Sequence, residues 1–236
     1  MAFLQLSKQH NNRQAYNWLV YDICDRFLVK FSEHYVGDLY DLGCGTRPYE
    51  EFFLKHAKSY TGVDWSDTLH SLTADVIADL NVGVPAEDAC ADTIVSLSVM
   101  EHLHTPQVFL AESYRLLRPN GKMILQVPFQ WHIHEAPHDY YRYTPFALKH
   151  MFGQAGFENV EVHASSGFFT TIFIKCNYFS RKLIRGPKIL RWITRSLLSI
   201  FWYSNQKLAP LMDRFDRNWS EEAQGYWVLA QKPSAS

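Results

Sequence analysis

The sequence lacks the features that mark several classes of protein. Its four cysteines are scattered without CxxC spacing, which argues against a zinc site or a disulfide framework and for reduced thiols. The net charge is −1, so no overall positive field attracts nucleic acid, and no such partner is expected. No window holds about twenty uninterrupted apolar residues, so we predict no membrane-spanning helix. The N-terminus lacks a basic start followed by a long apolar run, and we therefore expect a cytoplasmic protein without a secretory signal.

Segments with the apolar spacing of strands alternate with segments that have helical spacing. Strands are predicted over residues 37–43, 59–65, 75–80, 91–98, 122–129, 158–166 and 225–232, and helices over 13–34, 49–56, 105–121 and 144–157. This alternation predicts an α/β fold, in which a mostly parallel sheet of about seven strands carries helices on both faces. Ligands of such sheets bind beyond the carboxyl ends of the strands.

The first strand ends in the segment YDLGCGTRPY, where Asp41 precedes a turn with Gly43 and Gly45. Glycines at such a turn adopt positive φ and let the backbone approach a ligand closely. A dinucleotide site would place a third glycine at the position of Pro48, so the dinucleotide interpretation is weakened. Two glycines by themselves predict no more than a tight turn.

Acidic residues also close the second and third predicted strands. Asp64 lies nineteen residues after Gly45, where its carboxylate can accept hydrogen bonds from both hydroxyls of a ribose. The neighbouring Trp65 can lie along an adenine ring or pack in the core. Asp79 can accept a hydrogen bond from an adenine amino group or cap a helix. The sequence thus predicts an adenosine site and leaves these two alternatives open.

The segments DLGCGTRPY, TGVDW, ADL, SLSVMEHLHTP and LRPNGKMILQVP together resemble the class I S-adenosylmethionine-dependent methyltransferases of the type 11-like group. The resemblance covers about residues 35–165 and returns in the last strand. It implies a Rossmann-like fold and S-adenosylmethionine as the cofactor. The combination of DLGCGTRPY with HDYYRYTP further resembles a bacterial branch that is associated with the synthesis of cell-surface polysaccharides and glycolipids.

The resemblance also implies which residues contact the cofactor. The methionine part would lie against Asp41, Gly43 and Gly45, with the backbone of Cys44. Asp64 would hold the ribose. Asp79 would meet the adenine through its side chain, Leu80 through its backbone N–H, and Ser96 would face the cofactor from the end of the fourth strand.

The segment MEHLH raises the question of a metal site. Some small-RNA methyltransferases of this superfamily bind a divalent metal through an ExxEH pattern and a later histidine. Here Ser98 replaces the first acid and leaves Glu101 and His102, which make a poor site for a hard metal. Three other histidines could complete a site, although no spacing requires it: His104, His132 and His134. We therefore predict no metal, with His102 packing near the cofactor pocket.

The segment HIHEAPHDYYRYTP follows the fifth strand and so begins at the ligand edge of the sheet. Methyl transfer to a hydroxyl requires an aligned acceptor and a group that removes its proton. His138 is the first candidate for this base and His134 the second, with Asp139 or Glu135 fixing the imidazole tautomer. Arg142 can bind a carboxylate or phosphate of the acceptor, or form a structural ion pair with Asp139.

Residues 162–212 contain no Asp or Glu, although basic and aromatic residues are frequent there. One predicted helical face is apolar, with Ile189, Ile193, Leu197, Ile200 and Phe201. Another face is basic, with Lys188, Arg191 and Arg195. This pattern predicts a peripheral membrane contact through residues 172–207, at the inner face of the membrane. The alternative is a pair of helices that covers the active site as a lid.

These observations favour a single domain of residues 1–236 that methylates a hydroxyl of a sugar or lipid-linked glycan. Its expected parts are a helical segment (1–34), a cofactor-binding core (35–165), a basic amphipathic helical insertion (166–212), and the last strand with a tail (213–236). A small quinone-like or natural-product acceptor is the alternative, and the acceptor atom is left open between O, N and C. A non-catalytic relative would be expected to lack the glycine turn or the ribose acid, and both are intact.

Overall fold

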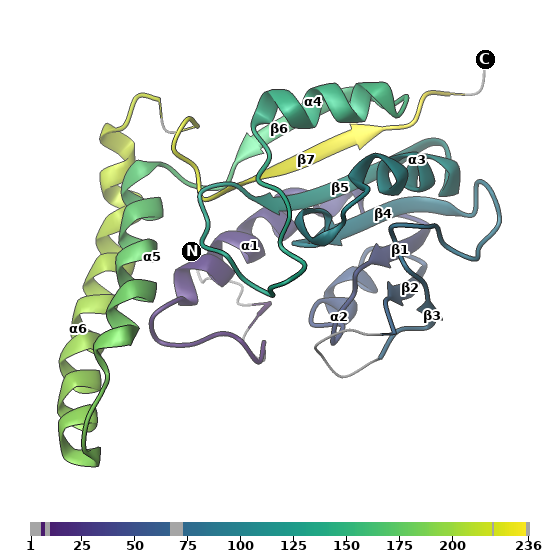
Figure 1. Cartoon of the computed structure of the whole chain (residues 1–236). Helices are drawn as coiled ribbons and strands as arrows, with labels where there is room; N and C mark the ends of the chain where they lie inside the picture. The colour runs from purple at the N-terminus through teal and green to yellow at the C-terminus, as the bar shows by residue number, and fades with distance from the viewer. Residues whose placement is uncertain (1–5, 8–9, 67–72, 219, 235–236) are drawn as a thin grey trace. The chain divides into compact units, whose positions relative to one another are not determined.

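A computed structural model describes residues 6–7, 10–66, 73–218 and 220–234 (Figure 1). The chain falls into two compact units. The first, here called the sheet unit, comprises residues 30–163 and 225–236, and the second, the helical unit, comprises residues 1–29 and 164–224. Each unit is described by itself.

The sheet unit contains one seven-stranded sheet in the order β3-β2-β1-β4-β5-β7-β6. The strands are β1 (Asp38–Leu42), β2 (Ser59–Asp64), β3 (Val76–Ile77), β4 (Ala91–Leu97), β5 (Leu117–Pro128), β6 (Glu158–Ala164) and β7 (Gly225–Gln231). Strands β3, β2, β1, β4 and β5 pair in parallel, and β7 runs antiparallel to β5. The predicted α/β fold with a mostly parallel sheet of about seven strands is therefore confirmed.

The central strands are covered on both faces. Successive side chains of a strand point to opposite faces, yet Met123, Ile124 and Leu125 of β5 are all fully buried, as are Ile94 and Val95 of β4. Near-continuous apolar runs of this kind are typical of parallel strands between helical layers. The helices of this unit are α2 (Glu50–Phe53), α3 (Pro106–Leu116) and α4 (Pro145–Gln154), with the 3₁₀ turns η1 (Ser32–His34) and η2 (Met100–His102).

In the sheet unit, the structure corrects the bounds of several predicted elements. The helix expected over residues 105–121 ends at Leu116, and β5 already begins at Leu117, which pairs with Ala91. A residue before proline disfavours the helical conformation, so Pro119 acts further upstream than expected. The third strand, expected over residues 75–80, has two residues, since Asp79 accepts the backbone N–H of Asn81 and starts a turn.

The helical unit contains α1 (Trp18–Lys30, of which Lys30 belongs to the sheet unit), α5 (Phe168–Ser180) and α6 (Lys188–Met212). Helix α1 is shorter than the predicted residues 13–34 because turns precede it. In Figure 1, α5 and α6 form a pair of long helices. The indole N–H of Trp202 donates to the Ser180 hydroxyl at 2.8 Å, and this buried contact fixes their register.

Two further predictions concern bonding and membrane spans. None of the four cysteines forms a disulfide bond. Within the described ranges, no helix has both the length and the apolar character needed to cross a bilayer. The single-domain organisation stays a prediction.

Candidate active site

The carboxyl ends of four neighbouring strands meet at one edge of the sheet. Asp41 of β1 is in register with Gly62 of β2 and Val95 of β4, and Val95 is in register with Ile124 of β5. Parallel pairing therefore brings the loops that follow β1, β2, β4 and β5 to the same edge. These loops carry nearly all of the residues that the sequence predicts for the site.

The turn after β1 is bound to β2 and opens toward free space. The N–H groups of Gly43 and Cys44 donate to the carbonyl of Val63 at 2.8 and 3.1 Å. Gly43 has φ +86°, and a Cβ there would lie 2.2 Å from a methyl carbon of Val99, so this position requires glycine. Gly45 has φ +54°, and a Cβ there would meet no described atom within 4 Å. Among the described atoms, the space beside the Cα of Gly45 is therefore open, while its N–H donates to Asp64 and its carbonyl accepts from the Thr73 hydroxyl at 2.9 Å.

Asp64, at the end of β2, faces this turn. One carboxylate oxygen accepts the N–H of Gly45 at 2.6 Å, and the other accepts the N–H of Trp65 at 2.7 Å. Trp65 is 37% exposed, so it is not a core side chain. Its ring lies edge-on to the ring of His138, with centroids 5.6 Å apart. The loop after β5 thus reaches the end of β2.

Beneath the turn, Asp41 is a buried acid. The Tyr60 hydroxyl donates to its carboxylate at 2.7 Å. Burial, reinforced by repulsion from Asp64, raises the pKa of Asp41 to about 7, and Tyr60 and Arg47 oppose the shift. Burial also raises the pKa of the Cys44 thiol to about 12, so Cys44 is not a reactive thiolate.

Three of the predicted cofactor residues are buried or already hydrogen-bonded within the protein. Asp79 caps a turn by accepting both the backbone and the side-chain N–H of Asn81 at 2.9 Å. Leu80 is buried. Ser96 is fully buried and donates to the carbonyl of Leu42 at 2.7 Å, so its hydroxyl ties β4 to the end of β1. Contacts of these three residues with a cofactor stay predictions.

The loop after β5 is fastened to η2 by its backbone. The N–H groups of Tyr140 and Tyr141 donate to the carbonyl of Glu101 at 2.9 and 3.3 Å. The Tyr143 hydroxyl donates to the carbonyl of Met100 at 3.0 Å. A ring N–H of His102, at Nδ1, donates to the carbonyl of His138 at 2.7 Å. The histidine-rich loop is therefore held over the ends of β4 and β5.

Asp139 and Arg142 form a bidentate ion pair within this loop. The two terminal guanidinium nitrogens donate to the two carboxylate oxygens at 2.6 and 2.8 Å. Hydrogen bonds from Arg142 hold the pKa of Asp139 well below its usual range. Arg142 also donates to the carbonyl of His132 at 3.0 Å, so the pair stabilises the loop. An anchoring role toward an anionic acceptor stays a prediction, and it would require Arg142 to leave Asp139.

The two candidate bases differ in their surroundings. His138 is exposed, and its Nδ1 lies 3.2 Å from the Tyr140 hydroxyl. His134 is half-buried, and its Nδ1 lies 3.4 Å from a carboxylate oxygen of Asp139. Asp139, one of the two carboxylates expected to set the tautomer, thus lies beside His134, and it accepts the backbone N–H of His134 at 2.9 Å. Burial lowers the pKa of His134, which keeps its imidazole neutral.

Sequence reasoning named the members of one cluster at this edge, but it did not select them as a group and predicted no metal. Glu101 is fully buried, and neither of its carboxylate oxygens accepts a hydrogen bond from another described residue. Nε2 of His102 and Nε2 of His134 lie 3.7 and 3.9 Å from Oε1 of Glu101. Burial raises the pKa of Glu101 to about 8. The pair Glu101–His102 was visible in the sequence, but the path of the loop selects His134 as the third member.

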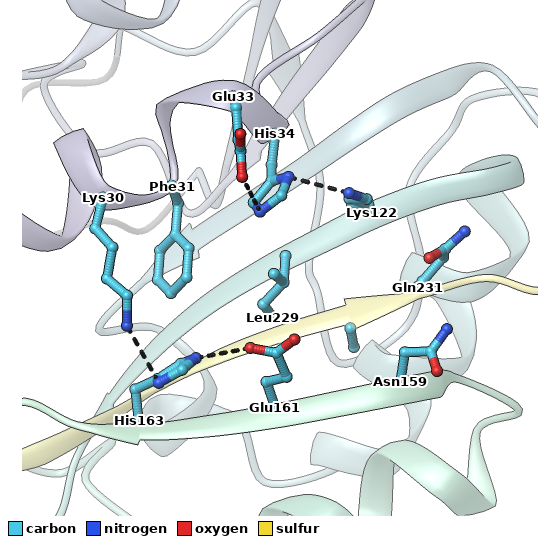
Figure 2. A pocket seen from close by; sticks show the side chains of 11 residues that line it. Lys30, Phe31, Glu33, His34, Lys122, Asn159, Glu161, His163, Leu229 and Gln231 are labelled. Carbon is cyan, nitrogen blue, oxygen red and sulfur yellow. Dashed lines mark hydrogen bonds and ion pairs between the residues drawn. The ribbon is translucent and has the colours of Figure 1, made fainter.

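A cavity of about 340 Å³ lies elsewhere in the sheet unit (Figure 2). Lys30 contacts His163 at 3.2 Å, and Lys122 contacts His34 at 3.0 Å across its wall. Lys122 pairs with Thr93 near the start of the parallel part of β5, so the cavity lies toward the opposite edge of the sheet. None of the predicted site residues lines it.

A family model for a methyltransferase domain matches residues 16–162, which is more than half of the chain. The chain belongs to this methyltransferase family. The matched region includes the glycine turn, Asp64, η2 and the loop after β5. The predicted membership of the methyltransferases is thereby confirmed, whereas the narrower polysaccharide branch stays a prediction.

Two curated relatives are similar over part of their length. The chain is 30% identical over 114 residues to a ubiquinone biosynthesis O-methyltransferase of Maricaulis maris, covering 43% of this chain and 45% of that protein. It is 28% identical over 97 residues to a probable S-adenosylmethionine-dependent methyltransferase of Mycolicibacterium smegmatis, covering 39% and 38%. The chain thus spans less than half the length of both relatives.

Solved structures with low sequence identity share the fold. The [4+2]-cyclase SpnF has a TM-score of 0.62 at 16% identity, covering 95% of this chain and 86% of that one. Phosphoethanolamine N-methyltransferase 2 of Haemonchus contortus, in complex with S-adenosylmethionine, has a TM-score of 0.57 at 16% identity, covering 94% and 56%. Because one neighbour is a cyclase, the fold alone does not determine the reaction.

Asp41 makes the stability of the protein depend on pH. Its folded pKa of about 7 lies above the ordinary value of 3.8, so between these values the folded state binds more protons than the unfolded state. The free energy of unfolding should therefore fall as the pH rises through this window. Asp41→Asn keeps an acceptor for Tyr60 and removes the titration.

Urea unfolding at about pH 5 and about pH 8 should show the variant gaining stability relative to wild type as the pH rises. The exposed Asp88 supplies the matched control, because Asp88→Asn should give a constant difference from wild type. Parallel pH profiles for Asp41→Asn and wild type would contradict the assignment.

Proposed function

We propose that this protein transfers the methyl group of S-adenosylmethionine to a hydroxyl oxygen of a small, membrane-borne acceptor. The observation that carries the proposal is the carboxylate of Asp64 beside the open backbone at Gly45, within the region that matches the methyltransferase family. The intact turn and acid also argue against a non-catalytic relative.

The residues at this edge fit the cofactor. Each oxygen of Asp64 accepts one backbone N–H and retains a lone pair, so the carboxylate can also accept hydrogen bonds from ribose hydroxyls. The exposed ring of Trp65 offers an apolar face for the adenine. When bound, S-adenosylmethionine supplies an electrophilic methyl group. The task of the protein is then to align the acceptor and to accept its proton.

The loop after β5 would form the acceptor side. His138 is exposed beside Trp65 and is suited to take the proton of a hydroxyl that approaches the methyl group. His134, oriented by Asp139, is the second candidate. Arg142 would bind an anionic group of the acceptor if it exchanges Asp139 for that group.

Two acceptor classes have support. A quinone-like phenol is favoured by the similarity to a ubiquinone biosynthesis O-methyltransferase. A hydroxyl of a sugar or lipid-linked glycan is favoured by the exposed Tyr140 and Tyr141, whose neighbouring rings, 6.3 Å apart, can pack against a sugar. Acceptors of both classes can carry a lipid chain that resides in a membrane.

The surface of α6 supports peripheral attachment at the inner face of the membrane through residues 172–207. Ile189, Trp192 and Ile200 are exposed by 76%, 69% and 68%. The exposed bases Lys188, Arg191 and Arg195 interleave with this apolar face. Apolar insertion and attraction to anionic lipid headgroups act together on such a helix. The alternative, a lid over the active site, would bury these side chains when substrate binds.

The reaction is tested with S-adenosylmethionine that carries a labelled methyl group. A short-chain prenylated catechol and a lipid-linked disaccharide serve as acceptors, and the site of the label is read by mass spectrometry. Label on a phenolic or sugar oxygen supports the proposal. Label on nitrogen or carbon in these or related acceptors, or calorimetry that finds no cofactor binding, contradicts it.

Asp64→Ala removes the acceptors for two ribose hydroxyls. Binding of S-adenosylmethionine should weaken by about 2–4 kcal/mol, as expected for lost hydrogen bonds to a charged group. Calorimetry on folded protein measures this. Asp64→Asn, which keeps one acceptor, should lose less, and the exposed Asp88→Ala should bind like wild type. Unchanged affinity in Asp64→Ala would remove this residue from the cofactor site.

His138→Ala should lower the rate of methyl transfer about 10²–10⁴-fold, the range for loss of a general base. Cofactor affinity should survive, because the proposed cofactor contacts lie in the loops after β1 to β4. The exposed His150→Ala is the matched control. A wild-type rate in His138→Ala would shift the assignment to His134.

Replacement of Lys188, Arg191 and Arg195 by Gln should reduce sedimentation with anionic vesicles of phosphatidylglycerol. Wild type should detach as the salt concentration rises, since salt screens exposed charges. The control replaces Lys55, Lys58 and Lys149 of the sheet unit by Gln, which removes the same number of charges. This control should retain more vesicle binding than the triple variant of α6. If wild type does not sediment at low salt, the lid interpretation is favoured.

A further inference from the structure

Glu101, His102 and His134 form a compact cluster at the ligand edge of the sheet unit. Each offers one ligand atom, and these atoms lie within 4.8 Å of one another. Glu101 and His102 come from η2 after β4, and His134 comes from the loop after β5. The cluster is separate from the glycine turn and Asp64, which lie after β1 and β2.

The acid of this cluster has no bonding partner to compensate its burial. Glu101 has no exposed surface, and both of its carboxylate oxygens lack a hydrogen-bond donor among the residues that the structure describes. Burial disfavours a carboxylate in this condition unless it takes a proton or a cation. The groups that face it are two imidazole nitrogens, which bind metal ions well.

In both imidazole rings, Nδ1 lies beside an oxygen acceptor and Nε2 lies on the side of Glu101. Nδ1 of His102 donates to the carbonyl of His138 at 2.7 Å, so Nε2 of the neutral ring carries the lone pair. Nδ1 of His134 lies 3.4 Å from the carboxylate of Asp139, and its Nε2 lies on the side of Glu101. Histidines that bind metals have their second nitrogen held by a carbonyl or a carboxylate. His102 has this arrangement, whereas Nδ1 of His134 lies beside the carboxylate without a hydrogen bond to it.

The spacing of the inner atoms is close to that of a coordination sphere. Nε2 of His102 and Nε2 of His134 lie 3.7 and 3.9 Å from Oε1 of Glu101. Ligand atoms about 2.0–2.1 Å from a tetrahedral zinc ion are about 3.4 Å apart. All three ligand atoms lie within 4.8 Å of one another, so changes in the side-chain torsion angles would bring them to these separations.

We propose that Glu101, His102 and His134 bind one divalent first-row transition-metal ion. Two imidazoles and one carboxylate select Zn²⁺ and its neighbours over Mg²⁺ and Ca²⁺, which take oxygen ligands. Three protein ligands leave a coordination position open. In a consequence that rests on the proposed function, a hydroxyl of the acceptor bound there loses its proton more readily. His134 is then a metal ligand with no lone pair for a proton, which leaves His138 as the candidate base. Sequence reasoning left three histidines as candidates for the third ligand, and the structure brings His134 to Glu101 and His102.

Zn²⁺ titration by calorimetry tests the proposal on chelator-treated full-length protein without S-adenosylmethionine. Wild type should bind one ion per chain. Loss of a group that only hydrogen-bonds to a metal-binding histidine weakens metal affinity about 10–100-fold. His134→Ala and Glu101→Gln remove direct ligands, so each should weaken Zn²⁺ affinity by at least about 100-fold. His104→Ala removes an exposed histidine of the same chain region and should bind like wild type.

Co²⁺ gives a second measurement, because its visible absorption reports the geometry and number of its ligands. The wild-type spectrum should show bound Co²⁺ with nitrogen and oxygen ligands, and His134→Ala should lose it. Circular dichroism checks that each variant is folded, and Glu101→Gln keeps the shape of the buried side chain. Failure of wild type to bind either ion overturns the proposal, as does binding of the ion by Glu101→Gln and His134→Ala with the affinity of wild type. Affinity for S-adenosylmethionine, measured without metal, reports on the proposed function separately.

Discussion

The hydrogen bond between the carboxylate of Asp64 and the N–H of Gly45 connects the two features on which the site depends. At 2.6 Å it joins the end of β2 to the turn after β1, and Val63 holds the same turn through the N–H groups of Gly43 and Cys44. These bonds fix the turn without filling the space at Gly45. A ligand that binds there meets a preformed backbone, and little ordering entropy opposes its binding.

The strands, the turn and most helices could be predicted from the sequence because they depend on local patterns. Apolar runs bounded by polar residues located β1, β2, β4 and β5 within one or two residues at their carboxyl ends. The pattern gave no sign that β5 would begin at Leu117, since that start depends on pairing with Ala91 of another strand. The start of β5 is therefore set by pairing with another strand and not by the intrinsic strand propensity of residues 117–121.

The site shows the same division. Asp41, Gly43, Gly45 and Asp64 lie together because strand register dictates their positions, and register follows from the alternation of strands and helices. The loop after β5 has no such constraint. The carboxylate of Asp139 lies beside His134 and Arg142 instead of His138, because hydrogen bonds from the loop to Glu101 and Met100 set its path. No residue spacing encodes those contacts. The histidines, the acid and the arginine of the loop could therefore be named from the sequence, but which of them pair could not.

The carbonyl of Glu101 receives two N–H groups of the loop, while its side chain faces the two histidines. Glu101 therefore holds the loop through its backbone carbonyl and contributes to the histidine cluster through its side chain. A change that shifts the backbone at Glu101 moves the aromatic residues 140–141 and the histidine cluster together. If the loop alone were exchanged between two related enzymes, it would lose the η2 carbonyls that hold it in place. A functional exchange therefore has to include η2 together with the loop.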